Sequence, residues 1–385
     1  MPERLPLFAT CSKGTEELLA DELKELGAQR VKQDRGGVRF SANPLESLRV
    51  LFHTRIAMRL LWPLAEGEAI GAEGLYDAAK EVPWEDHLDT HTTFAVDATL
   101  KDSEHKHSGF VALKVKDAIV DRLRDKLGGR PDVDTRHPDV RVMVHLNKKQ
   151  LSLSLDLAGE PLNRRGYRVE QTQAPMKETL AAAVLRAAGY TGEEPLADPM
   201  CGSGTLVLEA AMIAMRRPPG LNHSFAVERW PAWEEMADKQ LGELRAEAKA
   251  NERVPPFILL GRDREPEAIA ACKANAKAGR FGQVVHFEEA DAMTAPPPSG
   301  APGLIVSNPP YGDRLTAGGQ KGMKTFYFKL SEALSQWHGW RMSFLCGNPA
   351  FESAFHKKPT ARRKLFNGPL ECQQYSYPQN PPSGT

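Results

Sequence analysis

The stretch Pro195-Leu-Ala-Asp-Pro-Met-Cys-Gly-Ser-Gly-Thr205 joins a short apolar strand to a glycine-rich turn, and an apolar helix is expected over residues 206–215. Gly202 and Gly204 allow the backbone to approach a ligand closely and to present N–H groups at the start of that helix. A strand, a glycine-rich turn and a helix in this order open a doubly wound sheet. The stretch therefore predicts an α/β domain with a ligand site at this turn.

The residues around the turn indicate a ligand without phosphate. A dinucleotide fingerprint would have a third glycine where Val207 stands, and the turn has no Walker lysine. Asp198 at the strand end would repel a pyrophosphate, but it could pair with a cationic amine. Asp263 ends the next predicted strand, where an acid commonly accepts from ribose hydroxyls, although Asp263 or Glu265 could instead cap the following helix. Asp291, after the third strand, could accept from an adenine amino group or be an exposed loop acid.

A second unusual stretch, Ser307-Asn-Pro-Pro-Tyr-Gly312, follows the apolar run Gly303-Leu-Ile-Val306, which is expected to be the fourth strand. The Asn308 side chain offers a carbonyl acceptor. The backbone carbonyl of Pro309 offers another, held in place because Pro309 and Pro310 restrict the backbone dihedrals. Tyr311 adds a flat ring. Two converging acceptors beside a ring suit a planar group that carries an NH2, such as a nucleobase.

The composition is that of an ordinary globular protein. Because the net charge is zero, a binding site for a polyanion such as RNA would have to come from a local cluster of basic residues. The 385 residues carry 50 Lys+Arg and 50 Asp+Glu. Five scattered cysteines form no CxxC pair, so we expect no metal site and a reducing cytoplasm. No apolar run is long enough to predict a membrane span, and there is no signal-peptide pattern. Basic residues on one helix face, near turns and in the C-terminal segment are candidate RNA contacts: Lys114, Lys116, Lys148, Lys149, Arg164, Arg165, Lys357, Lys358, Arg362 and Arg363.

Three segments are expected. Residues 1–60 alternate strand and helix like a small α+β unit, and residues 61–165 form a second small unit with a long amphipathic helix over 110–127. Residues 166–385 carry the α/β domain, with an insertion rich in Pro, Trp and charge at 216–256.

The two motifs together resemble amino-group-directed S-adenosylmethionine (SAM) methyltransferases. Arg164-Arg-Gly-Tyr-Arg168 and Ala174-Pro-Met-Lys-Glu-Thr-Leu-Ala181 resemble the junction found in THUMP-linked methyltransferases, and residues 108–122 with 129–131 resemble a THUMP RNA-binding domain. The resemblance covers nearly the whole chain and is strongest to the N-terminal, guanine-N2-methylating half of bacterial large-subunit ribosomal RNA methyltransferases. It implies a Rossmann-like class I methyltransferase domain behind a ferredoxin-like segment and a THUMP domain.

The resemblance also implies roles for single residues. The cofactor is SAM, and its methionine moiety is expected at the turn formed by Asp198, Met200, Cys201, Gly202, Gly204 and Thr205. Asp263 would hold the ribose and Asp291 the adenine, and Asn308 would also contact the cofactor. Asn308, Pro309, Pro310 and Tyr311 would be catalytic, with Tyr311 stacking on a flipped guanine whose N2 amine is methylated.

The expected substrate is 23S rRNA, and three alternatives stay open. They are a tRNA guanine-N2 methyltransferase, an adenine-N6 DNA methyltransferase and a non-catalytic RNA-binding factor. The oligomeric state is not predicted.

Overall fold

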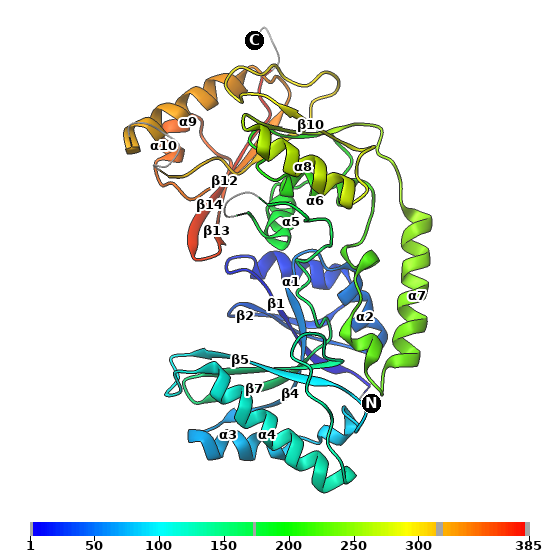
Figure 1. Cartoon of the computed structure of the whole chain (residues 1–385). Helices are drawn as coiled ribbons and strands as arrows, with labels where there is room; N and C mark the ends of the chain where they lie inside the picture. The colour runs from blue at the N-terminus through cyan, green and yellow to red at the C-terminus, as the bar shows by residue number, and fades with distance from the viewer. Residues whose placement is uncertain (1–2, 172–174, 313–318, 382–385) are drawn as a thin grey trace. The chain divides into compact units, whose positions relative to one another are not determined.

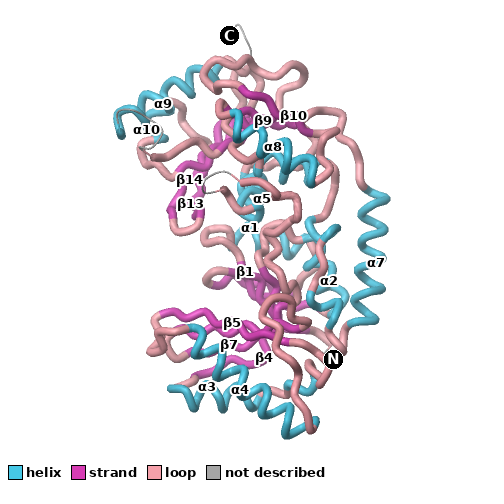
Figure 2. The backbone as a smooth tube through the Cα atoms, viewed as in Figure 1, coloured by secondary structure: helices cyan, strands magenta, loops and turns pink. Residues whose placement is uncertain are grey.

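The computed structural model describes residues 3–171, 175–312 and 319–381, which form two compact units (Figures 1 and 2). Unit 1 comprises Met1–Cys11, Ala20–Leu162 and His223–Ala246, and unit 2 comprises Ser12–Leu19, Asn163–Asn222 and Glu247–Thr385. Each unit is built on its own seven-stranded sheet. The mixed α/β architecture that the sequence predicts is confirmed.

The sheet of unit 1 has the strand order β2-β3-β1-β4-β7-β6-β5. Its strands are β1 (Leu5–Thr10), β2 (Gln29–Asp34), β3 (Gly37–Ala42), β4 (Arg59–Glu68), β5 (Phe94–Lys101), β6 (Val140–Asn147) and β7 (Gln150–Asp156). Strand β4 pairs with β1 on one side and with β7 on the other. The first two predicted segments therefore share one sheet, and the boundary expected at residue 60 falls inside β4.

The helices of this part of the chain follow from local sequence signals. They are α1 (Glu16–Glu25), α2 (Pro44–His53), α3 (Gly71–Glu81), the 3-10 turn η1 (Trp84–Asp86) and α4 (Ser108–Leu127). Helix α2 begins at a capping box between Asn43 and Glu46. Helix α4 buries the Val111, Val115 and Ile119 side chains and packs beside α3 (Figure 1). The predicted amphipathic face is thus the buried face of α4.

Part of the predicted insertion belongs to unit 1. The insertion contains the 3-10 turns η2 (Pro219–Asn222) and η3 (Ala226–Arg229) and helix α7 (Glu234–Asn251). The Val227 N–H donates to Leu157 O at 3.2 Å, the Trp230 Nε1–H donates to Asp139 O at 3.2 Å, and the rings of Trp62 and Trp233 lie 6.0 Å apart. These contacts explain why residues 223–246 group with the first sheet rather than with the α/β domain that surrounds them in sequence.

The sheet of unit 2 has the order β10-β9-β8-β11-β12-β14-β13. Its strands are β8 (Leu196–Asp198), β9 (Leu259–Asp263), β10 (Val285–Glu289), β11 (Leu304–Ser307), β12 (Arg341–Cys346), β13 (Ala361–Asn367) and β14 (Leu370–Tyr377). Strands β10, β9, β8, β11 and β12 are parallel, and β14 pairs antiparallel with β12 and β13. The chain winds from β8 to β9 in one direction and returns to β11 on the other side of β8. This switch in strand order confirms the Rossmann-like prediction and leaves a crevice where ligands bind in such folds.

Alternate residues of these strands enter two separate cores. On one face Leu304 and Val306 pack with helices α5 (Glu178–Ala187), α6 (Thr205–Ala214) and α8 (Pro266–Ala278). On the other face Ile305 packs with α9 (Gly319–Ser335) and α10 (Phe351–Phe355). The helices cover both faces, so the central strands β8 and β11 are buried at every position, as central strands of a three-layer domain are. Within the described ranges, no helix is long and apolar enough to cross a membrane.

Candidate active site

A cavity of about 330 Å³ opens at the carboxyl ends of β8, β9, β10 and β11 in unit 2. Eight of the predicted cofactor residues line it: Asp198, Met200, Cys201, Gly202, Thr205, Asp263, Asp291 and Asn308. They come from four different strand ends, which the strand order brings together at the switch point. The cavity is also lined by Pro175, Met176 and Phe326, which the residue patterns did not single out.

Gly204 lies behind the cavity wall and shapes the turn instead of lining it. Its φ is +83°, a left-handed conformation that favours glycine. A Cβ atom there would lie 3.1 Å from Cys272 Sγ and 3.1 Å from the Phe287 ring. Gly204 is therefore required for the close packing of the turn on helix α8 and strand β10.

Asp198 is buried at the base of the cavity. Its Oδ1 accepts hydrogen bonds from the Ser307 hydroxyl at 2.6 Å and from the Met200 N–H at 3.1 Å. Burial raises the pKa of Asp198 to about 7, and the nearby charge of Asp263 acts in the same direction. A carboxyl group with this pKa would gain from a cationic ligand that stabilises its charged form.

Asp263 and Asp291 are held by backbone groups at the outer strand ends. Asp263 accepts from the Gly202 N–H at 2.9 Å and from the Glu265 N–H at 3.1 Å, so it ties the end of β9 to the glycine-rich turn. Asp291 is exposed and accepts from the Met293 N–H at 2.9 Å. An ionised carboxylate has about four lone-pair positions, so each group retains acceptor capacity for a ligand.

Hydrogen bonds within the loop and to other elements fix the residues after β11, and one of them runs from Asn367 Nδ2 to the Tyr311 hydroxyl at 3.4 Å. The Ser307 hydroxyl bonds to Asp198, and the Tyr311 hydroxyl donates to Asn308 Oδ1 at 2.5 Å. The Tyr327 hydroxyl donates to Pro310 O at 2.6 Å, and Asn348 Nδ2 donates to Tyr311 O at 3.0 Å. Asn308 and Pro310 line the cavity, so the loop presents the amide group at a defined place.

Tyr311 packs against both cores of unit 2 and is not among the lining residues of the cavity. Burial raises the pKa of its hydroxyl to about 12. In this conformation the hydroxyl orients the Asn308 amide. The expectation that the ring stacks on a base stays a prediction, as does the role of the Pro309 carbonyl.

Two thiols lie together beside the turn. Cys201 Sγ and Cys272 Sγ are within hydrogen-bond distance at 3.6 Å, and both are buried free thiols. Cys272 Sγ also donates to Gly202 O at 3.0 Å. The two residues are 71 positions apart in the chain, and nothing in the sequence indicates that they meet.

The candidate RNA contacts divide into exposed and buried groups. Lys148, Lys149, Arg164 and Lys358 are exposed, and Lys114 and Lys116 line a second cavity, of about 550 Å³, in unit 1. The assignment of Arg165 to an RNA surface is wrong. Its side chain is only 1% exposed and lies 3.5 Å from the Glu209 carboxylate, so it forms a buried ion pair.

Three cations of the predicted C-terminal basic segment already have partners. Arg362 pairs with Glu352, Arg363 pairs with Glu17 at 2.6 Å, and Lys357 donates to Asn380 Oδ1 at 3.0 Å. Burial also lowers the pKa of Lys357. Glu352 and Glu17 therefore offset two of the positive charges that the sequence places in this segment. Among the described residues, no group of three or more His, Cys, Asp or Glu side chains could hold a metal ion.

The strand order and the polar groups at the switch point define a class I methyltransferase, and comparison with known proteins agrees. Residues 165–376 match the family described as RMKL-like, methyltransferase domain. Residues 71–156 match the THUMP domain and residues 6–61 match the RlmL ferredoxin-like domain. The chain belongs to the RMKL-like methyltransferase family, with THUMP and RlmL ferredoxin-like domains preceding the methyltransferase domain. The recognised resemblance is thereby confirmed.

Individual relatives are similar over nearly the whole chain. A Syntrophotalea carbinolica protein named ribosomal RNA large subunit methyltransferase K/L is 40% identical over 98% of this chain and 54% of its own length. The chain thus spans about half the length of that relative. A Synechocystis protein named as a candidate RNA methyltransferase, slr0064, is 36% identical over 97% of this chain and 96% of its own length.

A solved structure of SMU.472, described as a candidate methyltransferase complexed with SAH, has a TM-score of 0.89 and 28% identity. It covers 98% of this chain and 99% of its own. The family match and this neighbour confirm S-adenosylmethionine as the predicted cofactor.

Proposed function

We propose that the chain methylates the exocyclic N2 amine of a guanine in RNA, with 23S rRNA in the bacterial cytoplasm as its substrate. The observation that carries this proposal is the place of Asn308. Its amide lines the cavity directly after β11, and the neighbouring Ser307 is hydrogen-bonded to Asp198 at the cavity base. The hydrogen bond between Ser307 and Asp198 thereby links Asn308, an acceptor for the target amine, to the site proposed for the methyl donor.

The residues present fit S-adenosylmethionine. SAM supplies a methyl group made electrophilic by its bond to a positively charged sulfur. Asp198 is suited to its amine, and the glycine-rich turn to the remainder of its methionine moiety. Asp263 and Asp291 stand at the next two strand ends, as required for the ribose and the adenine. Among the described residues that line the cavity, four are carboxylates, Asp198, Asp263, Glu265 and Asp291, and one is a cation, Arg264, which also favours a cationic ligand.

Asn308 would act on the target amine by accepting a hydrogen bond from it. An amide oxygen has two lone pairs, and the Tyr311 hydroxyl occupies one of them. The other, with the Pro309 carbonyl, can accept from the NH2 of a base that has left its stack. These bonds favour the positive charge that develops on the amine nitrogen. The fixed loop supplies orientation, which in-line transfer needs more than it needs a general base.

Support for RNA comes from the first 165 residues. The THUMP match includes α4, whose Lys114 and Lys116 line a cavity with a small excess of cations, and relatives carry names that specify ribosomal RNA. We accordingly propose a ferredoxin-like segment over 1–60, a THUMP domain over 61–165 and the methyltransferase domain over 166–385. Because the chain spans about half of the first relative, only the activity of its own site is proposed.

Nucleoside mass spectrometry of RNA and DNA from a strain lacking this gene tests the proposal. Loss of N2-methylguanosine from 23S rRNA, restored by the wild-type gene and not by Asn308→Ala, is the expected result. Loss of the same nucleoside from tRNA would transfer the activity to tRNA, and loss of N6-methyladenine from DNA would transfer it to DNA. An unchanged set of nucleosides, together with RNA binding, would make the chain a non-catalytic factor.

A further inference from the structure

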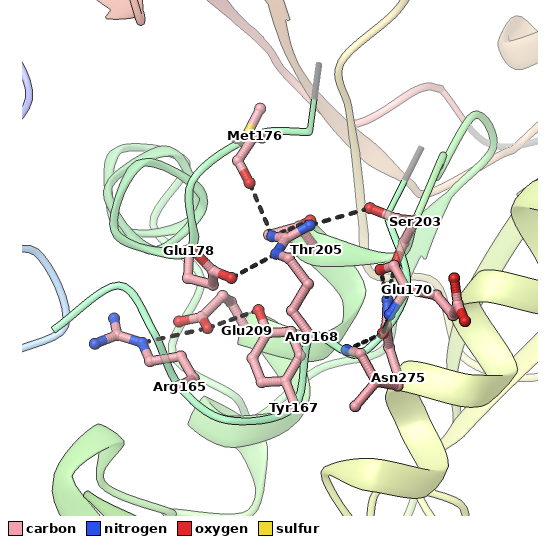
Figure 3. Close-up of polar contacts among 11 residues, drawn as sticks. Arg165, Tyr167, Arg168, Glu170, Met176, Glu178, Ser203, Thr205, Glu209 and Asn275 are labelled. Atoms are coloured by element: carbon pink, nitrogen blue, oxygen red, sulfur yellow. Dashed lines mark hydrogen bonds and ion pairs between the residues drawn. The ribbon is translucent and has the colours of Figure 1, made fainter. Parts of the chain in front are cut away.

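The Arg168 guanidinium joins two walls of the cofactor cavity (Figure 3). Its Nη2 donates to Met176 O at 2.9 Å and to Thr205 Oγ1 at 3.0 Å, and its Nη1 donates to Ser203 Oγ at 3.3 Å. Met176, Ser203 and Thr205 all line the cavity. Arg168 itself does not line it, so any effect on the ligand must pass through these three residues.

A carboxylate and an amide fix the segment that carries Arg168. Arg168 Nε donates to Glu178 Oε1 at 2.6 Å, and the Glu178 side chain is 5% exposed. Asn275 on α8 accepts from the N–H groups of Val169 and Glu170, both at 2.9 Å, and donates to Ser203 O at 3.2 Å. The guanidinium therefore has a defined orientation, and the backbone of the glycine-rich turn is held by the same network.

The direction of these hydrogen bonds determines what the two hydroxyl groups can do. An arginine side chain has only donors, so Ser203 Oγ and Thr205 Oγ1 must accept from it. Their own hydrogens then point elsewhere. Ser203 and Thr205 are 4% and 5% exposed, and within the described part of the chain neither hydroxyl donates to a protein acceptor. A buried donor without an acceptor is unfavourable, which indicates that a ligand atom accepts from it.

We propose that Arg168 is a positioning residue that turns the Ser203 and Thr205 hydroxyls toward the carboxylate at the amino-acid end of SAM. This inference rests on the proposed assignment of the cavity as the SAM site. An anionic group suits this corner because Thr205 is the first residue of α6 and the guanidinium lies behind both hydroxyls. Asp198, at the cavity base, suits the neighbouring amine. The Ser203 and Thr205 hydroxyls would then bind the carboxylate of the amino-acid end, and Asp198 would bind its ammonium group.

Binding of two ligands to the purified full chain tests the inference. S-adenosylhomocysteine has the amino-acid end, whereas 5′-methylthioadenosine lacks it. Arg168→Lys keeps a positive charge but removes the planar set of donors. We expect it to weaken S-adenosylhomocysteine binding by roughly 10-fold or more and methylthioadenosine binding by less than about 2-fold, because hydrogen bonds to charged groups are the strong ones. Isothermal titration calorimetry measures both.

Arg165→Lys is the matched control, since Arg165 lies on the same segment in a buried pair with Glu209. It should change neither affinity by more than about 2-fold, because Arg165 is not among the described residues that line the cavity and is not one of the groups that hold Ser203 or Thr205. Ser203→Ala should reproduce the ligand-selective loss, and adding Arg168→Lys to it should cause less than the sum of the two losses.

The outcomes separate this inference from the function. Equal weakening of both ligands by Arg168→Lys, or by Ser203→Ala, would overturn the positioning role. Failure of the wild-type chain to bind either ligand would instead remove the cofactor assignment on which the inference rests. Thermal unfolding of each variant shows whether the fold is retained, and Ser203→Ala keeps the test informative if Arg168→Lys unfolds.

Discussion

The cavities of units 1 and 2 differ in charge and are built in different ways: carboxylates dominate the cavity of unit 2, whereas the cavity of unit 1 has a small excess of cations. The cavity of unit 2 has carboxylates that are buried or fixed by backbone N–H groups at three strand ends. The cavity of unit 1 has four cations on one helix face and the loop after it, Lys114, Lys116, Arg124 and Arg130, beside the three carboxylates of Asp117, Asp121 and Asp132. Fixed groups recognise a small ligand by geometry, whereas mobile surface cations attract a polyanion by charge. Substitutions in the unit 2 cavity should thus give large, specific effects, and those of surface cations, in the unit 1 cavity or elsewhere, small and additive ones.

The largest effect is expected from Asn308→Ala. Removing the amide takes away an acceptor for the target amine and leaves the buried Tyr311 hydroxyl without its 2.5 Å partner. Methyl transfer should fall by roughly 10²-fold or more, as expected when one preorganised polar group is removed. SAM affinity should stay within about 3-fold, because a single hydrogen bond to the ligand contributes little more. Single-turnover kinetics and calorimetry measure the two quantities.

Tyr311→Phe is the matched control for Asn308. It keeps a ring and removes only the hydroxyl that orients the amide. We expect a loss smaller than that of Asn308→Ala, without a change in SAM affinity. Equal methylation rates for wild type and Asn308→Ala would refute the role of the loop after β11.

Asp198→Asn should have the next largest effect, on the affinity for SAM and on the number of protons released when SAM binds. The folded chain ionises Asp198 at about 7, because burial raises the pKa from 3.8. Pairing with a cationic amine favours the charged carboxylate, so SAM binding near pH 6–7 should release a proton. The Asn variant should release less and bind SAM roughly 10-fold more weakly at pH 8, because it cannot form the charge-assisted hydrogen bond. Calorimetry in buffers of different ionisation enthalpy counts the protons.

Ionisation of Asp198 should favour SAM binding but should lower the stability of the ligand-free fold. In the unfolded chain Asp198 ionises near 3.8, whereas in the folded chain it ionises near 7. The free energy of unfolding of wild type relative to Asp198→Asn should therefore fall as pH rises from about 4 to about 7. A difference that does not vary over this range would show that Asp198 titrates normally.

The unit 2 site was largely predictable because its signals are local. Strand, turn and acid follow one another in sequence, and the order of parallel strands then brings Asp198, Asp263, Asp291 and Asn308 to one edge. What sequence reasoning missed depends on long-range contacts. Glu209 buries Arg165 from 44 positions away, and Arg168 reaches Thr205 across 37. A basic residue beside a turn has the same local sequence whether it faces solvent or a buried carboxylate.

The strands of unit 1 show the same limit. Strand β2 is almost wholly exposed, with the sequence Gln29-Arg-Val-Lys-Gln-Asp34, and so has no alternating apolar pattern. Strand β4 contains Pro63 and loses register with β7 between Pro63 and Ala65. Proline and an irregular register argue against a central strand, yet pairing with β1 and β7 holds β4 in the sheet. In both segments, pairing with neighbouring strands stabilises a strand that the local sequence does not indicate.

Removing both Lys114 and Lys116 should weaken RNA binding by a few-fold and reduce its salt dependence. Both side chains line the unit 1 cavity, although Lys116 is also 2.8 Å from Asp117. Each lysine that no longer neutralises a phosphate should lower the slope of log affinity against log salt by about 0.7 on single-stranded RNA, so the double alanine variant should show a slope smaller by about 1.4. Filter binding at several salt concentrations measures this slope. An unchanged slope would exclude the α4 face from the interface.

The smallest effect should come from the C-terminal basic segment, and it can be reversed in sign. Glu352 pairs with Arg362, and this hydrogen bond lowers the pKa of the Glu352 carboxyl, which is therefore ionised and neutralises the arginine. Arg362→Ala should thus change RNA affinity by less than about 2-fold, since exposed pairs contribute little. Lys358→Ala, at an exposed lysine nearby, should weaken binding more. Glu352→Gln should strengthen it slightly by releasing Arg362 for a phosphate. Weaker binding by Glu352→Gln would mean that the pair supports the hairpin of β13 and β14 rather than restraining a phosphate contact.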